Sequence, residues 1–469
     1  MKYETVCGLE VHTELLTKTK IFCSCTTDFG GEANSHCCEV CTGMPGTLPV
    51  LNERVLEYAV KCGLALGCEI TRFSRFDRKN YFYPDLPKAY QISQLYLPIC
   101  KNGAVEINDS VNGGKKTVRI REIHMEEDAG KLIHKDGRSF INYNRAGVPL
   151  LEIVSEPDLS SGEEAAEYTQ KLREILKYIG ISDCKMQEGS LRADVNVSVR
   201  ERGSTDLGTR TEMKNLSSFK AIKAAVDFEA QRQITRLENG RAIKQETRRW
   251  DENKNASVLM RTKETADDYK YFPEPDIPPL VISGEYIERI RADLPELPEV
   301  KRTRYVDMGL SEYEAEILTG EPEYAKLFEQ TAELTDNPKE SAKWIMGEYL
   351  MLKKEAEGDL APEPLAKIIK LVNGGKITRE SGKKALRAVF TEGAEPLSFI
   401  KENGLEVIAD KELINRICSE VINENVKAVR EYKKGKDKTF NFLFGQCMRE
   451  LKEKASPDDI KRTLKEKLG

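Results

Sequence analysis

The sequence has no apolar stretch near the roughly 18 residues that a membrane-spanning helix needs, which excludes an integral membrane protein built on such helices. The first residues, Met1, Lys2 and Tyr3, do not lead into the apolar core typical of a signal peptide. The chain also has no internal repeat of solenoid period and no low-complexity segment. We therefore expect a cytoplasmic protein with no membrane partner.

The usual nucleotide-binding and hydrolase signatures are missing too. The chain contains no G-x-x-x-x-G-K-[ST] sequence, because Gly375 and Lys376 are followed by Ile377. It also lacks G-x-G-x-x-G, G-x-S-x-G and H-E-x-x-H. Any chemistry with ATP must therefore use a site other than a P-loop.

The chain has no excess of positive charge. It contains 73 Lys and Arg residues against 78 Asp and Glu residues, a net charge of −5, so bulk charge alone cannot hold a nucleic acid. The charge is unevenly distributed, because residues 426–469 contain 13 basic and 7 acidic residues, leaving a net −11 on residues 1–425. This pattern favours an acidic enzyme body whose basic end recruits a polyanion; the alternative is a solvated helical surface.

The chain length and the changes in residue pattern along the sequence predict several domains. At roughly 100–200 residues per domain, 469 residues suggest two to four. Residues 1–295 mix strand-like and helical patterns, which predicts an α+β domain that ends in a proline-rich stretch. Beyond it, helical periodicity predicts an all-α domain at 296–405 and a small helical tail at 406–469, where Asp410 is the expected N-cap of the first helix.

Periodicity also places individual elements in the first domain. Alternation of apolar residues predicts strands around residues 7–11 and 195–199. Apolar residues at helical spacing predict helices over residues 56–66 and 165–179.

Five of the 12 cysteines lie within residues 23–41, and without a secretory signal such usage indicates a reducing compartment. The pattern C-x-C followed by C-x-x-C supplies four thiolates from two tight loops, as a tetrahedral zinc site requires. Cys38 is preferred to Cys37 because its spacing to Cys41 is that of a zinc knuckle. We expect structural zinc; the alternative is a set of buried free thiols. The predicted ligands are Cys23, Cys25, Cys38 and Cys41.

Four predicted strands carry polar side chains on the face opposite their apolar residues, because alternate residues of a strand point the same way. The four sets are Glu10, His12 and Glu14; His124, Glu126 and Asp128; Arg192, Asp194 and Asn196; and Arg210, Glu212 and Lys214. Neighbouring carboxylates repel unless a cation neutralises them, and oxygen ligands with one imidazole suit Mg²⁺ or Mn²⁺. We therefore predict a metal and nucleotide cradle; the alternative is a sheet with one solvated face.

Several long motifs occur in an order that carries a family resemblance. They are GLEVH at 8–12, the four-cysteine knuckle, KNYFYPD at 79–85, HMEEDAGK at 124–131, IVSEPD at 153–158, YFPEPD at 271–276 and FLFGQ at 442–446. Over essentially its full length the chain resembles the B subunits of the aspartyl/glutamyl-tRNA(Asn/Gln) amidotransferases, the GatB/GatE family. Its tail is similar to YqeY proteins.

The resemblance implies a glutamine-synthetase-like cradle at 1–295 with a mixed or antiparallel sheet, then a helical domain at 296–405 and a YqeY-like tail at 406–469 that contacts tRNA. It implies an ATP-dependent carbon–nitrogen ligase with glutamine as amido donor. The side-chain carboxylate of Glu-tRNA(Gln) or Asp-tRNA(Asn) is phosphorylated, and ammonia then displaces phosphate. An A subunit releases that ammonia from glutamine, and a C subunit completes a heterotrimer.

The resemblance also implies roles for individual residues. The expected Mg²⁺ ligands are Glu10, His12, Glu126 and Glu212, with Glu127, Asp128, Asp194 and Asn196 as further ligands or water holders. Arg192 and Lys214 are expected to grip phosphate or carboxylate oxygens, and with Glu10, His12 and Glu126 they form the predicted catalytic set. Arg192, Asp194, Asn196 and Lys214 are the predicted ATP and phosphate contacts.

Two other functions stay open from the residues. In one, the chain is a non-catalytic tRNA-binding or assembly component whose acidic sheet is only a polar face. In the other, it is a free-standing ligase acting on a small amino acid, which would not need a basic tail. No serine motif for the glutaminase nucleophile is present.

Overall fold

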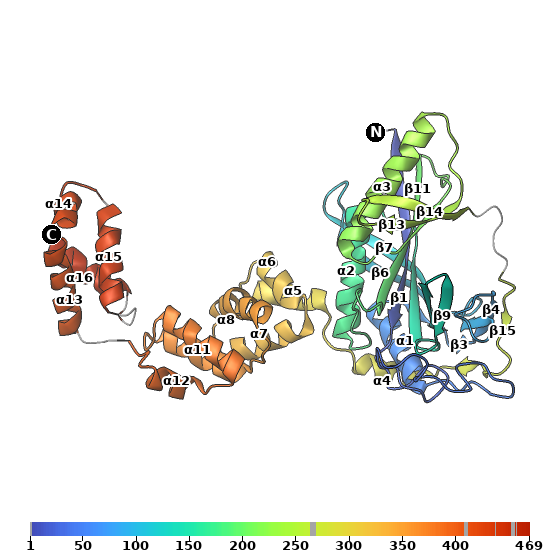
Figure 1. Ribbon diagram of the computed structural model, residues 1–469, viewed down its shortest axis with the longest axis horizontal. Coiled ribbons are helices and arrows are strands. Elements are labelled where there is room, and N and C mark those ends of the chain that lie inside the picture. The colour runs from blue at the N-terminus through green and yellow to red at the C-terminus, as the bar shows by residue number, and fades with distance from the viewer. Residues whose placement is uncertain (1, 263–268, 408–410, 437, 452–454, 456) are drawn as a thin grey trace. The chain divides into compact units, whose positions relative to one another are not determined.

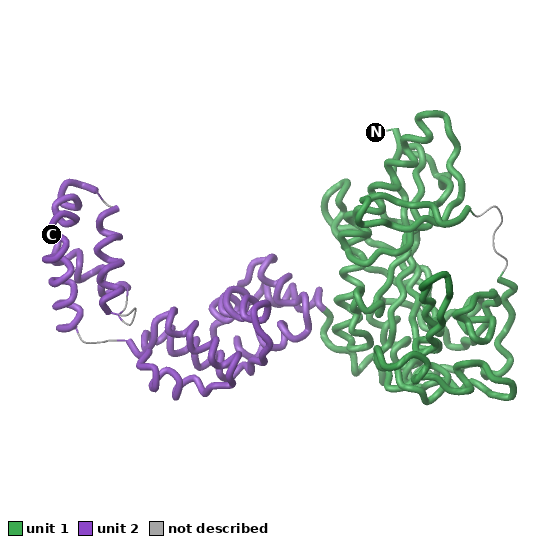
Figure 2. The backbone as a smooth tube through the Cα atoms, in the orientation of Figure 1, with its two compact units in different colours: residues 1–297 green, residues 298–469 purple. Residues whose placement is uncertain are grey.

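The computed structural model describes residues 2–262, 269–407, 411–436, 438–451, 455 and 457–469 (Figure 1). The chain divides into two compact units, residues 1–297 and 298–469 (Figure 2). The first unit contains the strands and the second is built from helices, so the α+β class predicted from the sequence is confirmed. Within these ranges, no helix is both long and apolar enough to cross a membrane.

A mixed sheet of nine strands forms the centre of the first unit. Its order is β14-β13-β12-β11-β1-β10-β7-β6-β2, and its neighbours are antiparallel except for the parallel pair β12 and β13. The strands are β1 (Tyr3–Glu14), β2 (Glu69–Ile70), β6 (Cys100–Asn108), β7 (Lys115–Glu127), β10 (Pro149–Ser155), β11 (Leu191–Glu201), β12 (Thr211–Lys214), β13 (Glu246–Asp251) and β14 (Ala256–Thr262).

Smaller sheets and the helices α1 to α4 complete the described part of this unit. The small sheets are β15-β4-β5 (Phe272–Pro273, Asp77–Asn80, Tyr90–Ser93), β16-β3 (Leu280–Val281, Phe73–Ser74) and β8-β9 (Lys131–Lys135, Arg138–Asn142). The helices are α1 (Glu53–Ala65), α2 (Gly162–Tyr178), α3 (Phe219–Glu238) and α4 (Gly284–Ala292). The helices predicted at 56–66 and 165–179 are thus confirmed as α1 and α2, and the side chains of Asn52 and Ser161 cap their N-termini.

One face of the large sheet is covered by helices, and this decides where the polar residues go. Leu9 and Val11 of β1 pack with Leu172 of α2 and Ile222 of α3 in a single buried core, and Figure 1 shows α2 and α3 lying along the sheet. Because side chains alternate along a strand, the polar residues of β1, β7, β11 and β12 point to the other face.

The second unit consists of short helices. These are α5 (Pro298–Asp307), α6 (Glu312–Thr319), α7 (Pro322–Thr335), α8 (Pro338–Trp344), the π-helix η1 (Ile345–Tyr349), α9 (Leu350–Glu355), α10 (Pro362–Asn373), α11 (Arg379–Glu392), α12 (Pro396–Glu402), α13 (Lys411–Glu424), α14 (Val426–Tyr432), α15 (Lys438–Glu450) and α16 (Pro457–Leu468). Residues of α13, α15 and α16 share one buried core, which includes Ile414, Leu443 and Leu464. The predicted N-cap Asp410 lies outside the described residues.

Candidate functional site

The register of the sheet brings the predicted polar residues together. β1 lies between β10 and β11, so His12 has Glu152 of β10 as its partner on one side and Arg192 of β11 on the other. In the same way Glu10 lies opposite Asp194. Further out, Asn196 of β11 pairs with Glu212 of β12, and Leu150 of β10 pairs with Glu126 of β7.

These side chains line a cavity of about 730 Å³, which we call the carboxylate pocket. Its lining includes Glu10, His12, Lys79, Glu126, Asp128, Glu152, Arg192, Asp194, Asn196, Arg210, Glu212 and Lys214. Glu126 is only 3% exposed and Asp128 only 5%. Buried carboxylates of this kind contradict the alternative of a merely solvated polar face.

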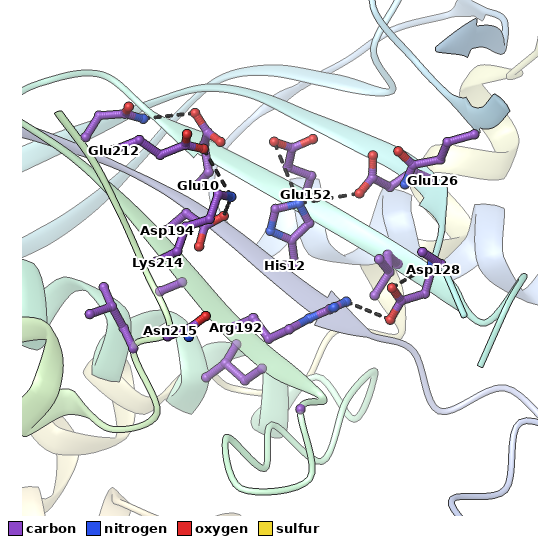
Figure 3. Close-up of a pocket in the computed structure, with 18 of the residues that line it drawn as sticks. Glu10, His12, Glu126, Asp128, Glu152, Arg192, Asp194, Glu212, Lys214 and Asn215 are labelled. Atoms are coloured by element: carbon purple, nitrogen blue, oxygen red, sulfur yellow. Dashed lines mark hydrogen bonds and ion pairs between the residues drawn. The ribbon is translucent and has the colours of Figure 1, made fainter. Parts of the chain in front are cut away.

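The centre of the pocket is a cluster of one histidine and two glutamates. His12 Nε2 lies 3.4 Å from Glu126 Oε1 and 3.8 Å from Glu152 Oε1. One ligand atom from each of the three residues falls within 4.8 Å of the others, and Figure 3 shows the imidazole between the two carboxylates. An imidazole with two carboxylates is a suitable donor set for Mg²⁺ or Mn²⁺.

The electrostatics of this cluster show an excess of negative charge. Burial opposes protonation of His12, but its hydrogen bond with Glu126 and the charge of Glu152 outweigh burial and raise its pKa to about 9. Burial likewise acts to raise the pKa of Glu126, yet the His12 hydrogen bond and neighbouring cations lower it to about 2. Burial and the charge of Glu126 raise the pKa of Glu152. A cation in the pocket would relieve this repulsion.

A second group in the same pocket holds its own cation. Lys214 Nζ lies 2.5 Å from Asp194 Oδ2 and 3.1 Å from Glu212 Oε1. Burial disfavours a charged lysine here, but the charges of Asp194 and Glu212 raise the pKa of Lys214 overall. Asn196 Nδ2 donates to Glu10 Oε1 at 3.0 Å. Among the predicted Mg²⁺ ligands, Glu212 thus belongs to this group and His12 and Glu126 belong to the other. Glu10 accepts the bond from Asn196, and its charge also acts on Glu152 of the His12 cluster.

Arg192 occupies a third position in the pocket. Its guanidinium donates to Asp128 Oδ2 at 2.7 Å, and Arg145 Nε lies 3.3 Å from the same oxygen. Glu14 is close by, since burial and the charge of Asp128 raise its pKa to about 8. Arg192 is therefore held by the carboxylate of Asp128, and Figure 3 shows its side chain extended toward Asp128.

Three charged residues that line the pocket, Lys79, Glu152 and Arg261, were not predicted from the sequence, and the predicted Glu14, His124 and Glu127 do not belong to its lining. Glu152 was a lone acid in an apolar run, and Lys79 was one base in an aromatic loop. Glu127 points to the opposite side of β7, where its Oε1 lies 2.5 Å from Lys88 Nζ and it accepts a bond from the Ile92 amide. The interpretation of Glu127 as a further ligand of this pocket is therefore wrong, because alternation separates it from Glu126.

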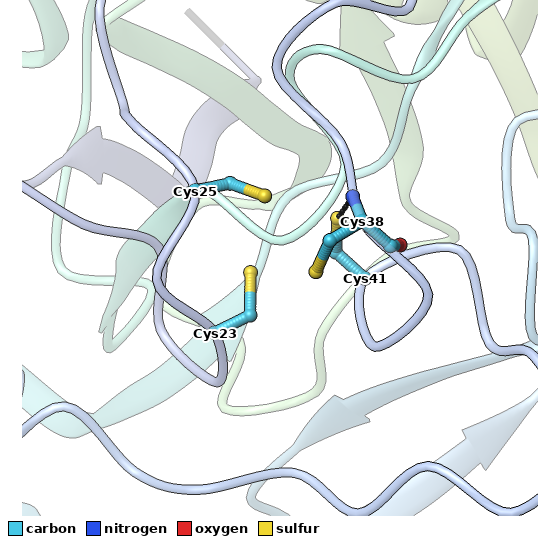
Figure 4. A group of neighbouring side chains, drawn as sticks. All are labelled: Cys23, Cys25, Cys38 and Cys41. Atoms are coloured by element: carbon cyan, nitrogen blue, oxygen red, sulfur yellow. Dashed lines mark hydrogen bonds between the residues drawn. The ribbon is translucent and has the colours of Figure 1, made fainter.

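The cysteine cluster, Cys23, Cys25, Cys38 and Cys41, forms a separate site. Its four sulfur atoms lie within 4.8 Å of one another, and Figure 4 shows the two loops directing them to one point. The thiol of Cys37 bonds instead to the Asn34 carbonyl at 3.1 Å. Cys38 rather than Cys37 completes the group, as its spacing predicted. A hydrogen bond from Cys23 lowers the pKa of Cys41 to about 5.

A buried lysine supports a negatively charged cluster. Lys20 is fully buried, and its Nζ lies 3.7 Å from Cys41 Sγ and 2.7 Å from the His36 carbonyl. Among the described residues, no carboxylate oxygen lies close enough to Lys20 Nζ, within 4.0 Å, to form an ion pair. Buried lysines normally have such an anionic partner. Thiolates around a divalent cation would supply that partner, so the donor set fits zinc.

Lys20→Met should weaken zinc binding by about 10–100-fold, the usual effect of losing a group that supports a metal ligand. The measurement is competition for zinc between the purified full-length chain and a chelating dye. Lys18→Met, at an exposed lysine two residues away, is the matched control. Equal affinities for the two variants would contradict a role for Lys20 at the cluster.

Comparison with known proteins gives a consistent result across the chain. Residues 5–288 match the model of the GatB/GatE catalytic domain, and residues 326–468 match that of the GatB domain. Proteins named as the B subunit of aspartyl/glutamyl-tRNA(Asn/Gln) amidotransferase are similar over the whole length. Those of Lachnoclostridium phytofermentans and Thermoanaerobacter pseudethanolicus are 53% and 54% identical, covering all of this chain and 99% and 100% of the relatives. That of Caldicellulosiruptor saccharolyticus is 51% identical, covering all of this chain and 99% of the relative.

Proposed function

Since this chain belongs to the GatB/GatE family of tRNA amidotransferase B subunits, we propose that it carries the ATP-dependent step of amidation on mischarged tRNA. The substrate is the side-chain carboxylate of Glu-tRNA(Gln) or Asp-tRNA(Asn), and the products are Gln-tRNA(Gln) and Asn-tRNA(Asn). The enzyme is thus a carbon–nitrogen ligase of the cytoplasm that uses glutamine as amido donor. An A subunit releases the ammonia from glutamine, and a C subunit completes the heterotrimer.

The chemistry explains why such a pocket is needed. A carboxylate does not react usefully with ammonia near neutral pH, because the leaving group would be oxide. In the proposed reaction a carboxylate oxygen attacks the γ-phosphorus of ATP and ADP leaves. Ammonia then attacks the acyl carbon. Inorganic phosphate leaves and carries with it the carboxylate oxygen that had attacked the phosphorus. Excluding water from the pocket protects the acyl phosphate from hydrolysis.

The observation that carries the proposal is the convergence of two kinds of groups in one pocket. His12, Glu126 and Glu152 would hold Mg²⁺, with Glu10 and Glu212 as further oxygen donors. When bound, that ion neutralises charge on the phosphate oxygens.

The cationic and polar residues of the pocket would act on the phosphates and on the substrate carboxylate. Arg192 and Lys214 would exchange their present carboxylate partners for phosphate or substrate carboxylate oxygens. Asp194 and Asn196 lie beside Lys214 and Glu10 and would orient the ATP phosphates.

The direct test is single-turnover amidation of both mischarged tRNAs by the purified three-subunit complex. We expect amidated product with ATP present and none without it. Running Glu-tRNA(Gln) and Asp-tRNA(Asn) in parallel also shows which of the two the complex serves. Product formation at the same rate without ATP would refute the phosphorylation step.

The tail should supply part of the affinity for tRNA, because residues 426–469 contain 13 basic against 7 acidic residues. Its core spans α13 to α16, so residues 406–469 should be removed as a whole. We expect the affinity for tRNA to weaken on the order of tenfold. The slope of log affinity against log salt concentration should become less steep by about 0.7–0.9 for each phosphate that the chain no longer binds. Amidation at saturating tRNA should change less.

A milder variant keeps the tail folded. Lys433→Gln together with Lys434→Gln removes two charges after α14, and it should shift affinity and salt slope in the same direction. If neither variant changes tRNA affinity or its salt dependence, the basic residues form only a solvated surface.

A further inference from the structure

A second pocket of about 770 Å³ adjoins the carboxylate pocket. The two share Tyr81, Lys214, Arg261 and Tyr269 in their linings. The rest of its lining consists of Asn80, Phe82, Tyr83, Asp85, Thr247 and Met260. We call it the aromatic pocket, and the chemistry described above makes no use of it.

The wall between the two pockets is a set of packed rings. The rings of Tyr81 and Tyr269 meet edge to face with their centroids 5.8 Å apart. Lys79 Nζ lies 5.7 Å from the Tyr81 centroid and 5.1 Å from that of Tyr269. The charges of Glu126 and Glu152 help raise the pKa of Lys79 against its burial, so this lysine links the ring wall to the centre of the carboxylate pocket.

Phe82 and Tyr83 differ from these rings in being open to solvent. Phe82 is 91% exposed and Tyr83 is 55% exposed. Within the described part of the chain, Phe82 makes no ring or cation contact. A phenyl ring this exposed contributes little to the stability of the fold, since it buries almost no apolar area. At the mouth of a pocket, it offers a flat face on which a planar ligand can stack.

The same pocket contains two cationic side chains together with the carboxylate of Asp85. Arg261 of β14 and Lys214 of β12 both line it, and Lys214 also faces Asp194 in the carboxylate pocket. Exposed aromatic rings next to basic side chains are the combination that binds unpaired nucleotides: the bases stack on the rings and the phosphates meet the cations.

We infer that the aromatic pocket binds the unpaired 3′-terminal nucleotides of the substrate tRNA, with a base stacked on Phe82. This inference rests on the proposed function, in which the reacting carboxylate belongs to an amino acid esterified to the last nucleotide of a tRNA. That nucleotide must then lie next to the carboxylate pocket, and the shared wall of Tyr81 and Tyr269 provides this proximity.

The base of ATP is the competing occupant, and a third pocket fits it better. A cavity of about 310 Å³ shares Glu10, Asn196 and Arg210 with the carboxylate pocket. Apolar side chains of Val6, Val154 and Leu207 contribute to its lining. A small recess with apolar walls suits a single base, whereas the solvent-exposed rings of the aromatic pocket suit the end of a polymer.

The test measures ammonium-dependent amidation by the three-subunit complex, with tRNA and ATP varied separately. Phe82→Ala should raise KM for Glu-tRNA(Gln) by about 5–100-fold, the usual range for one lost stacking partner. KM for ATP should stay unchanged. Phe82→Trp, which keeps a stacking surface, should restore the wild-type KM. Phe29→Ala is the matched control, because Phe29 is 76% exposed and lines neither pocket.

A second readout does not depend on catalysis. Uncharged tRNA carrying 2-aminopurine in place of its terminal adenine should lose fluorescence when it binds the full-length wild-type chain, because the base stacks on a ring. Phe82→Ala should abolish that quenching, and Phe82→Trp should keep it. The substituted side chain is on the surface, so the fold is preserved.

The outcomes separate this inference from the function on which it rests. No amidation by the wild-type complex would refute the proposed function itself. If the wild type is active but Phe82→Ala leaves both the KM for tRNA and the quenching unchanged, only the inferred role of the aromatic pocket in tRNA binding is overturned. A rise in KM for ATP instead of tRNA would also overturn it, by assigning the pocket to the nucleotide.

Discussion

His12→Ala and Glu126→Gln should each lower ammonium-dependent amidation of Glu-tRNA(Gln) by about 10²–10³-fold, the usual effect of removing one electrostatic group from a reacting centre. Under the proposed function both residues lie in the cluster where charge develops during phosphoryl transfer, and His12 Nε2 is 3.4 Å from Glu126 Oε1. The measurement supplies free ammonium in place of glutamine. In the proposed heterotrimer that route bypasses the glutaminase of the A subunit, so a defect must arise in the amidation step assigned to this chain.

Matched controls exist for both substitutions. His134→Ala and Glu106→Gln change the same residue types at exposed positions of β8 and β6, and both should keep wild-type amidation rates. In the His12 and Glu126 variants, glutamine hydrolysis by the partner and tRNA binding should persist. Near-normal amidation by both would refute the assigned centre and favour the non-catalytic, tRNA-binding alternative.

The second large effect concerns metal content. Cys38→Ala should lower bound zinc from about one ion per chain to nearly none, because a tetrahedral site with three thiolates loses most of its affinity. The melting temperature should fall by about 5–10 °C, because each kcal/mol of unfolding free energy lost lowers it by roughly 2–4 °C in a domain of this size. The amidation rate of the folded protein should change little, because the cysteine cluster does not line the carboxylate pocket.

The control for this experiment is the adjacent residue. Cys37→Ala removes a thiol that bonds to the Asn34 carbonyl outside the cluster, so zinc content and melting temperature should stay at wild-type values. Metal analysis by plasma mass spectrometry and thermal unfolding provide both readouts. Zinc-free wild-type protein prepared without chelator would contradict the assignment, as would equal zinc loss in the two variants.

The faces of individual strands could be predicted from the sequence because strand geometry is local. Alternation with a period of two places Glu10 with His12, and Arg192 with Asp194, on one face wherever the strand lies in the sheet. The same rule, applied to β7, separates Glu127 from Glu126. The cysteine cluster was predictable for a similar reason, since C-x-C and C-x-x-C fix the approach of sulfur atoms over a few residues.

The order of the strands could not be predicted, and it determines how the centre is composed. Glu152 joins His12 only because β10 is inserted between β1 and β7, and nothing in the sequence around Glu152 specifies that neighbour. Lys79 comes from β4, which belongs to a small sheet separate from the nine-stranded one. The division of the predicted ligands into a His12 group and a Lys214 group likewise follows from side-chain packing across strands, which is non-local.

The pairing of Lys214 with Asp194 and Glu212, and of Arg192 with Asp128, has a consequence for selectivity. Each of these two cations is already matched by a carboxylate. A lone anion must break these pairs and leave carboxylates uncompensated, whereas a cation meets the excess negative charge around His12, Glu126 and Glu152. A ligand that brings both signs at once lets every group exchange one partner for another. Under the proposed function, a polyphosphate accompanied by its metal ion would therefore enter the pocket more readily than a polyphosphate alone.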